Sequence, residues 1–148
     1  MIRDDYMLPE LPLDGVPEPV DGRLRVLVVA ETYPPDINGS SQFSHRLAQA
    51  MAGRGHDVHI AAPRPSKGRT MTRMDGAVTE HRFRSHTAFT YDTFHLCFPW
   101  EVRGEISRLM DELRPDVVHI ECHYILGRYF AKEAQSRGIR LIGTNHFI

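Results

Sequence analysis

The run Leu24 to Ala30 (LRVLVVA) most constrains the fold of this chain, because it is a nearly continuous stretch of leucine and valine. A strand with apolar side chains on both faces is buried on both faces, as in a parallel sheet covered by helices. A segment rich in proline and glycine follows at 31–39, and a helical pattern follows at 40–54. This order predicts the first unit of an α/β domain.

Strand and helix patterns alternate through the remainder of the sequence. Further strands are predicted at 57–62, 78–83, 116–121 and 140–144, and further helices at 100–113 and 126–137. The core-facing positions predicted for the first two helices are Phe43, Leu47, Ala50 and Met51, then Val102, Ile106, Leu109 and Leu113. The alternation predicts a Rossmann-like, doubly wound parallel sheet with helices on both faces.

The composition is that of a soluble globular domain, with 41% hydrophobic and 25% charged residues among 148. The apolar run at the start is far shorter than the roughly 20 residues of a membrane helix, and no secretory signal pattern precedes it. Two cysteines, Cys97 and Cys122, give no disulfide framework. We therefore expect a cytoplasmic protein, with possible peripheral contact to the inner face of the plasma membrane.

Charge is distributed unevenly along the chain. Residues 1–22 carry a net charge of −5 and four prolines, which predicts a disordered tail, whereas residues 23–148 carry +4. The bases between 64 and 84 form one cluster: Arg64, Lys67, Arg69, Arg73, Arg82 and Arg84. Such a cluster suits phosphates or an anionic membrane surface, but it equally suits a solvated loop and an exposed strand face. No nucleic-acid partner is expected.

The predicted strand order determines where a ligand should bind. If the strand order is 3-2-1-4-5, the order reverses between the first and fourth strands, and ligands bind outside the carboxyl ends there. The loops at 31–41 and 121–127 are then expected to face each other across a crevice.

The tetrapeptide Asn38-Gly39-Ser40-Ser41 opens the first helix inside this crevice. Backbone N–H groups at a helix start attract anions, and glycine permits close approach of a ligand. The same residues also suit a simple turn and helix cap, and both interpretations stay open. The sequence matches neither the dinucleotide fingerprint nor the ATPase phosphate loop.

Polar residues also follow the fourth and fifth predicted strands. His119, Glu121 and His123 share one parity along the chain, but their spacing matches no established zinc site. We expect His119 to be a hydrogen-bonded core residue and His123 to lie at the crevice. Asn145 and His146 follow the fifth strand, where His146 suits either an acceptor hydroxyl or a turn.

Aromatic residues are frequent in the irregular connection predicted at 84–99 and just after it. Tyr91, Phe94 and Trp100 can pack beneath the connection or contact an apolar acceptor. We expect them to be buried.

Three segments together resemble the amino-terminal domain of retaining glycosyltransferases of family four, which have the GT-B fold. They are RVLVVAETYPPDINGSSQFSHRLAQAMAGRGHDVHIAAP, RPDVVHIECHYILG and GTNHF, in an order that covers residues 23–148. The TNHF ending looks most like mannosyltransferases related to the phosphatidylinositol mannosyltransferases.

The resemblance implies transfer of a hexosyl group, mannosyl or glucosyl, from a GDP- or UDP-linked nucleotide sugar to a glycan or lipid hydroxyl, with retention of configuration. It implies no metal and no cofactor. Asn38, Gly39 and Ser40 correspond to the loop near the donor diphosphate, and His123 to the histidine that touches the donor sugar. Glu121, Asn145 and His146 are the further candidates for acceptor or sugar contacts. Membrane contact is expected through Arg64, Lys67, Arg69 and Arg73.

In the family, a carboxyl-terminal half binds the nucleotide. We expect this chain to be the amino-terminal half only, truncated before that domain and inactive alone. A non-catalytic Rossmann-like binding module remains the main alternative. An oxidoreductase domain is disfavoured, because its second strand would end in an acid, whereas this one ends Ala61-Ala62-Pro63.

Overall fold

The computed structural model describes residues 22–88 and 91–146, so the predicted tail lies outside the described residues except for Gly22. Six strands form one sheet in the order β3-β4-β2-β1-β7-β8. Their bounds are β1 Arg25–Val29, β2 Asp57–Pro63, β3 Met71–Asp75, β4 Val78–Phe83, β7 Val117–Ile120 and β8 Arg140–Gly143. All neighbouring strands are parallel except β3 with β4. The predicted doubly wound order is therefore confirmed, with β4, β7 and β8 as its third, fourth and fifth strands.

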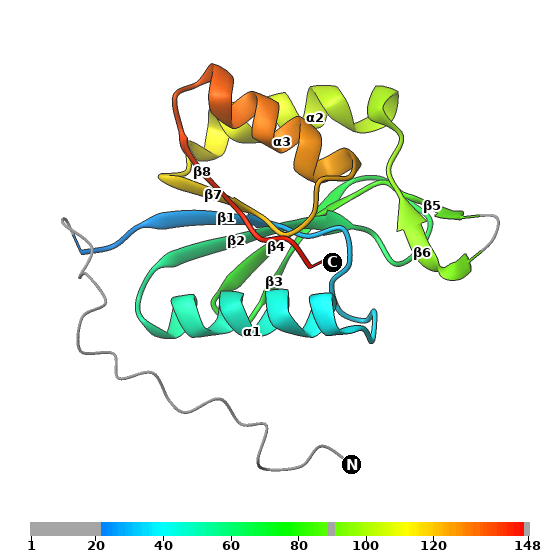
Figure 1. Cartoon of the computed structure of the whole chain (residues 1–148), viewed down its shortest axis with the longest axis horizontal. Helices are drawn as coiled ribbons and strands as arrows, with labels where there is room; N and C mark the ends of the chain where they lie inside the picture. Colours follow the sequence, from blue (N-terminus) through cyan, green and yellow to red (C-terminus); the bar gives the residue numbers. More distant parts are fainter. Residues whose placement is uncertain (1–21, 89–90, 147–148) are drawn as a thin grey trace, which may run out of the picture.

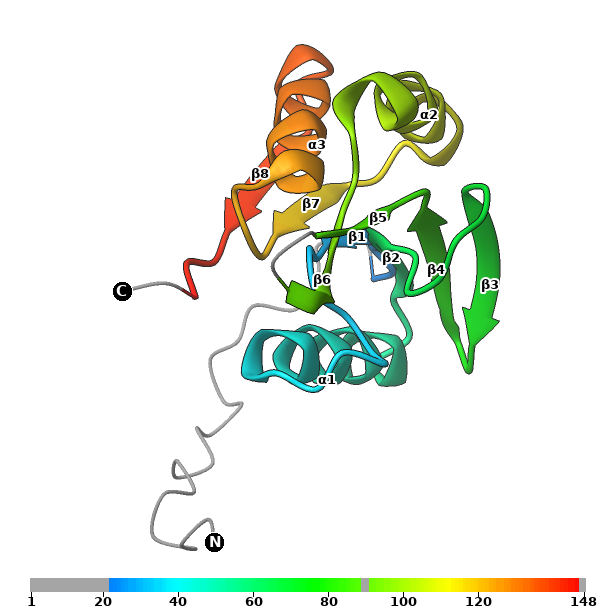
Figure 2. The ribbon, with the colours of Figure 1, turned by 90° about the vertical axis from the view of Figure 1, so that its right-hand side faces the viewer.

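Helices cover both faces of the sheet. Helix α1 (Gly39–Gly53) lies on one face, whereas α2 (Pro99–Leu113) and α3 (Ile125–Ser136) lie on the other (Figures 1 and 2). Side chains of β1 alternate between the two cores: Val26 and Val28 pack on the α1 side, and Leu27 and Val29 pack toward α2 and α3. This alternation explains why β1 is apolar along nearly its whole length.

The predicted core face of α1 is wrong for Phe43 and Ala50, which are exposed, whereas Met51 packs against the core as predicted. The buried residues are Ser41, Ser44 and Ala48, and Phe43 is 45% exposed. Small side chains let the helix approach the sheet closely, and the helix is thereby rotated so that Phe43 faces away from the core. The prediction for α2 is largely confirmed, with Val102, Ile106 and Leu113 buried.

Two pairs of antiparallel strands in the structure were not predicted from the sequence. Strand β3 forms an antiparallel hairpin with β4 through Gly76, which has φ +60°. Strands β5 (His86–Ala88) and β6 (Tyr91–Leu96) form a separate two-stranded sheet inside the connection predicted to be irregular. The Asp75-Gly76 pair is a hairpin signal that the alternation of strands and helices concealed. In the described part of the chain, no helix has the length and apolar character needed to cross a membrane.

The alternative of an exposed strand face does not hold for β4, because Glu80 and Arg82 are almost completely buried. Arg82 Nη1 donates to the carbonyl of Pro63 at 3.0 Å, and Arg82 Nη2 lies 3.2 Å from Glu80 Oε1. Arg73 also pairs with Glu80. Arg82 and Arg73 thus stabilise the sheet edge through Glu80, and Arg82 is buried whereas Arg73 stays more than half exposed.

Candidate functional site

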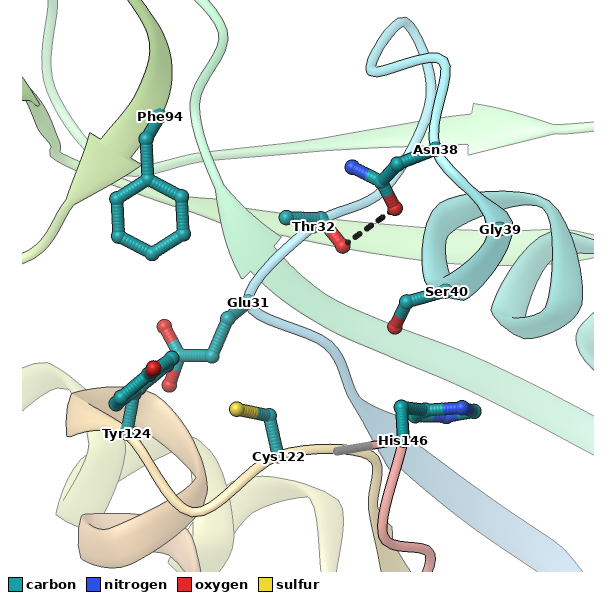
Figure 3. Close-up of a pocket in the computed structure, with 9 residues that line it drawn as sticks. All are labelled: Glu31, Thr32, Asn38, Gly39, Ser40, Phe94, Cys122, Tyr124 and His146. Atoms are coloured by element: carbon teal, nitrogen blue, oxygen red, sulfur yellow. Dashed lines mark hydrogen bonds between the residues drawn. The ribbon is translucent and has the colours of Figure 1, made fainter. Parts of the chain in front are cut away.

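The loops after β1 and β7 face one another, as predicted, and enclose a cavity of about 560 Å³. The cavity lies where the chain turns in opposite directions from β1 and β7, so the strand-order reversal creates it. Nine residues line it: Glu31, Thr32, Asn38, Gly39, Ser40, Phe94, Cys122, Tyr124 and His146 (Figure 3).

The start of α1 forms one side of this cavity. Asn38 caps the helix, since its Oδ1 accepts from Ser41 N at 2.8 Å, and Thr32 Oγ1 donates to the same oxygen at 3.2 Å. A side-chain carbon added at Gly39 would meet no atom within 4 Å. The cap interpretation is therefore confirmed, while the open space at Gly39 leaves the helix start accessible to a ligand.

A buried carboxylate holds His146 against the cavity. Glu121 is 1% exposed, and His146 Nε2 lies 2.5 Å from its Oε2. His119 Nε2 lies 3.4 Å from Glu121 Oε1 and 2.7 Å from Thr144 Oγ1. The expectation of a hydrogen-bonded His119 is therefore confirmed, and Glu121 joins the ends of β7 and β8.

The structure places His123 and Asn145 outside the set of lining residues. His123 is exposed, and its ring centroid lies 5.3 Å from that of Tyr124, which does line the cavity. Asn145 is exposed next to His146. The roles predicted for these two residues stay predictions.

Glu31 is a lining residue that the sequence analysis did not identify. It is 5% exposed, and its Oε1 accepts from Gly127 N at 3.1 Å. Burial raises the pKa of the Glu31 carboxyl to about 7, against the lowering effect of the backbone N–H groups of Gly127 and Leu126. Its position directly after a predicted buried strand that ends at the crevice is the signal that could have identified it.

Thr32, Cys122 and Tyr124 also line the cavity without having been predicted, whereas Phe94 was named as a possible acceptor contact without a predicted place. Phe94 extends from β6, so only the unforeseen β5–β6 sheet could place it here. Burial raises the pKa of the Cys122 thiol, so this cysteine is no ready nucleophile. Among the described residues, no three His, Cys, Asp or Glu side chains are grouped as a metal site requires.

A second hollow of about 610 Å³ is lined in part by residues of the basic cluster. Its lining includes Lys67, Arg84, His86 and His95, together with Phe98. Trp100 stacks on Phe98 with ring centroids 4.8 Å apart and is 74% exposed, so its predicted burial is wrong. The side chain of Tyr91 lies outside the described part of the structure.

Comparison with known proteins gives a consistent result. A sequence profile for Glycosyltransferase Family 4 matches residues 37–148, which is more than half of the chain. The GDP-mannose-dependent alpha-mannosyltransferase of Mycolicibacterium smegmatis is 29% identical over 105 residues, covering 70% of this chain and 27% of that protein. The protein of the same name from Mycobacterium tuberculosis is 26% identical over 122 residues, covering 82% of this chain and 32% of that protein.

The chain therefore spans less than a third of the length of these two curated relatives. Among solved structures, sucrose-phosphate synthase from Thermosynechococcus elongatus matches with a TM-score of 0.58 at 10% identity. That match covers 84% of this chain and 33% of the synthase, and at such low identity it supports the fold alone.

Proposed function

The chain belongs to glycosyltransferase family 4, and we propose that it supplies the acceptor-side part of an enzyme that transfers mannose from GDP-mannose to a glycan or lipid hydroxyl with retention of configuration. The single observation that supports this most is the cavity at the strand-order reversal, which the start of α1 and His146 both line. The choice of GDP-mannose follows the names of the two relatives.

The donor diphosphate is proposed to bind at the start of α1. The N–H groups there carry partial positive charge. That of Ser41 bonds to Asn38 Oδ1, and Gly39 leaves open space on its own side of the helix start. In glycosyl transfer the leaving diphosphate gains negative charge, so donors aimed at it stabilise the transition state. Asn38 and Ser40 flank this position.

The sugar is proposed to contact His146. Because Nε2 of this ring faces Glu121 Oε2, Nδ1 is the ring atom left to meet a sugar hydroxyl. The buried carboxylate fixes the orientation of the imidazole, as a second polar group does in many catalytic sites. Glu121 is thus a positioning residue for His146.

The test is an assay of the full gene product for transfer of the labelled sugar from GDP-mannose. Gly39→Val places a branched side chain over the helix start, so we expect the KM for GDP-mannose to rise about tenfold or more with an unchanged melting temperature. Gly53→Val, at the other end of α1, is the matched control, because it also meets no atom within 4 Å. Failure to transfer mannose, or an equal KM in both variants, would overturn the proposal.

We also propose that the loop between β2 and β3 contacts an anionic membrane surface. Lys67 and Arg69 are exposed there, and Arg64 Nη1 donates to the Arg69 carbonyl at 2.7 Å, which orders the loop. The exposed Trp100 lies beside the same hollow through its stacking on Phe98. Cosedimentation with phosphatidylglycerol vesicles should be salt-sensitive and weakened by Lys67→Glu. Equal binding to neutral phosphatidylcholine vesicles would contradict it.

A further inference from the structure

The cavity at the strand-order reversal has two chemically different ends (Figure 3). Asn38, Gly39 and Ser40 present the positive end of a helix on one side. Glu31 lies across the cavity from them, together with the aromatic rings of Phe94 and Tyr124. An anionic group and a polyhydroxylated ring are thus favoured at opposite ends.

Glu31 is buried at the start of α3, where its carboxyl meets backbone N–H groups of that helix. Its Oε1 accepts from Gly127 N at 3.1 Å, and the N–H of Leu126 also bonds to the carboxyl. A glutamine oxygen could accept from the same N–H groups. A carboxylate at 5% exposure loses hydration that these hydrogen bonds only partly replace, because the net effect is a raised pKa. The side chain nevertheless lines the cavity, where a ligand hydroxyl would supply a further hydrogen bond.

The two aromatic residues near Glu31 form an apolar wall. The rings of Phe94 and Tyr124 are 6.2 Å apart and meet at 82°, an edge-to-face pair that is stable without a ligand. A pyranose ring has an apolar face of C–H groups and a rim of hydroxyls, so it matches an aromatic wall beside a carboxylate. None of the nine lining residues is lysine or arginine, so no permanent cation favours an anionic ligand at this end.

We propose that Glu31, Phe94 and Tyr124 form the acceptor subsite, which binds a neutral pyranose ring through one hydroxyl donated to Glu31. This inference rests on the proposed function, since it assigns the acceptor end of the same cavity. It names the acceptor class as a neutral sugar unit, and it separates the acceptor end from the diphosphate end at Gly39.

The test is a titration of the chain with methyl α-D-mannopyranoside and methyl α-D-glucopyranoside, followed by amide NMR shifts. At least one glycoside should shift the amides of Tyr124 and Gly127 saturably, with little change along the outer turns of α2. Glu31→Gln keeps the bond to Gly127 N and should weaken binding about tenfold or more at pH 8. Tyr124→Leu should weaken binding similarly. Gln135→Ala, on the exposed surface of α3, is the control and should bind normally.

The pH dependence provides a readout that a structural role would not change. With a Glu31 pKa of about 7, binding should weaken about tenfold between pH 8 and pH 6 as the carboxylate is protonated. In Glu31→Gln the affinity should not change with pH over this range. Absence of saturable shifts with either glycoside, or unchanged affinity in Glu31→Gln and Tyr124→Leu, would overturn the subsite.

The two proposals can fail separately. Mannose transfer with an unchanged acceptor KM in Glu31→Gln would refute the subsite and leave the proposed function intact. Glycoside binding that depends on Glu31, in a protein that transfers no mannose from GDP-mannose, would refute the proposed function and leave the subsite intact.

Discussion

At the scale of single residues, His146 and His123 differ in their surroundings. His146 lines the cavity against the buried Glu121, whereas His123 is exposed outside it. Loss of one hydrogen bond to a sugar costs about 1.5–3 kcal/mol, or roughly 10- to 150-fold in rate. We expect His146→Ala to lower kcat about 100-fold and His123→Ala about tenfold, with no loss of stability at the exposed position. Measuring kcat and melting temperature on the same preparation checks this. Normal turnover with a lower melting temperature in His146→Ala would make its role one of packing.

A second residue-scale prediction concerns His59 and His81, which form a pair between β2 and β4. His59 Nδ1 lies 2.9 Å from His81 Nε2, and burial lowers the pKa of both, that of His81 to about 4. A histidine with a lowered folded-state pKa stays neutral when folded, so stability is lost as pH falls below the unfolded pKa near 6.5. For His81 this loss is about 2 kcal/mol between pH 7.5 and pH 5.

Glu31 has the opposite effect on stability. Its pKa is raised in the folded state, so its contribution to stability increases as pH falls toward 4.5. The informative quantity is therefore the stability difference between wild type and His81→Gln, measured by urea unfolding at both pH values. We expect this difference to change by about 2 kcal/mol in favour of the variant at pH 5. A difference that is independent of pH would show that folding does not lower the pKa of His81.

At the scale of elements, the site depends on how closely α3 approaches the loop after β7. A side-chain carbon at Gly127 would lie 1.8 Å from the carbonyl oxygen of Cys122, so only glycine fits there. We expect Gly127→Ala to destabilise the fold by about 2–4 kcal/mol, because backbone has to move. Gly104→Ala, in the exposed middle of α2 with no atom within 4 Å, should stabilise by about 0.5–1 kcal/mol. Urea unfolding of both variants is the measurement, and equal stabilities would contradict the steric argument.

Elements with a strong apolar pattern were predictable from the sequence. Strand β1, the parallel order around it and the core face of α2 follow from hydrophobic periodicity, and they fixed the two loops that form the cavity. The core face of α1 was not predictable in this way, because Ser41, Ser44 and Ala48 are buried for their small size rather than their hydrophobicity. Glu31 was missed because a buried carboxyl carries no periodic signal, and the place of Phe94 could not be predicted because it lies on the unforeseen strand β6.

At the scale of the whole molecule, the uneven charge predicts how the tail acts. Residues 1–22 carry −5, and the domain at 23–148 carries +4, so the intact chain is nearly neutral. The tail has no pattern with which to bury surface, so we expect its deletion to leave the melting temperature unchanged. Removing the net charge of −5 should, however, strengthen binding to phosphatidylglycerol vesicles at low salt, since the remaining net charge attracts the anionic surface.

Vesicle cosedimentation and thermal unfolding of the same two chains, with and without residues 1–22, separate these effects. The expected pattern is an equal melting temperature, tighter vesicle binding without the tail, and loss of that gain at high salt, where charges are screened over about 3 Å. Adding Lys67→Glu to the shortened chain should reverse part of the gain, because Lys67 is exposed on the proposed contact loop. If the shortened chain melted many degrees lower, the tail would pack on the domain. If both chains bound vesicles equally well, net charge would not govern membrane contact.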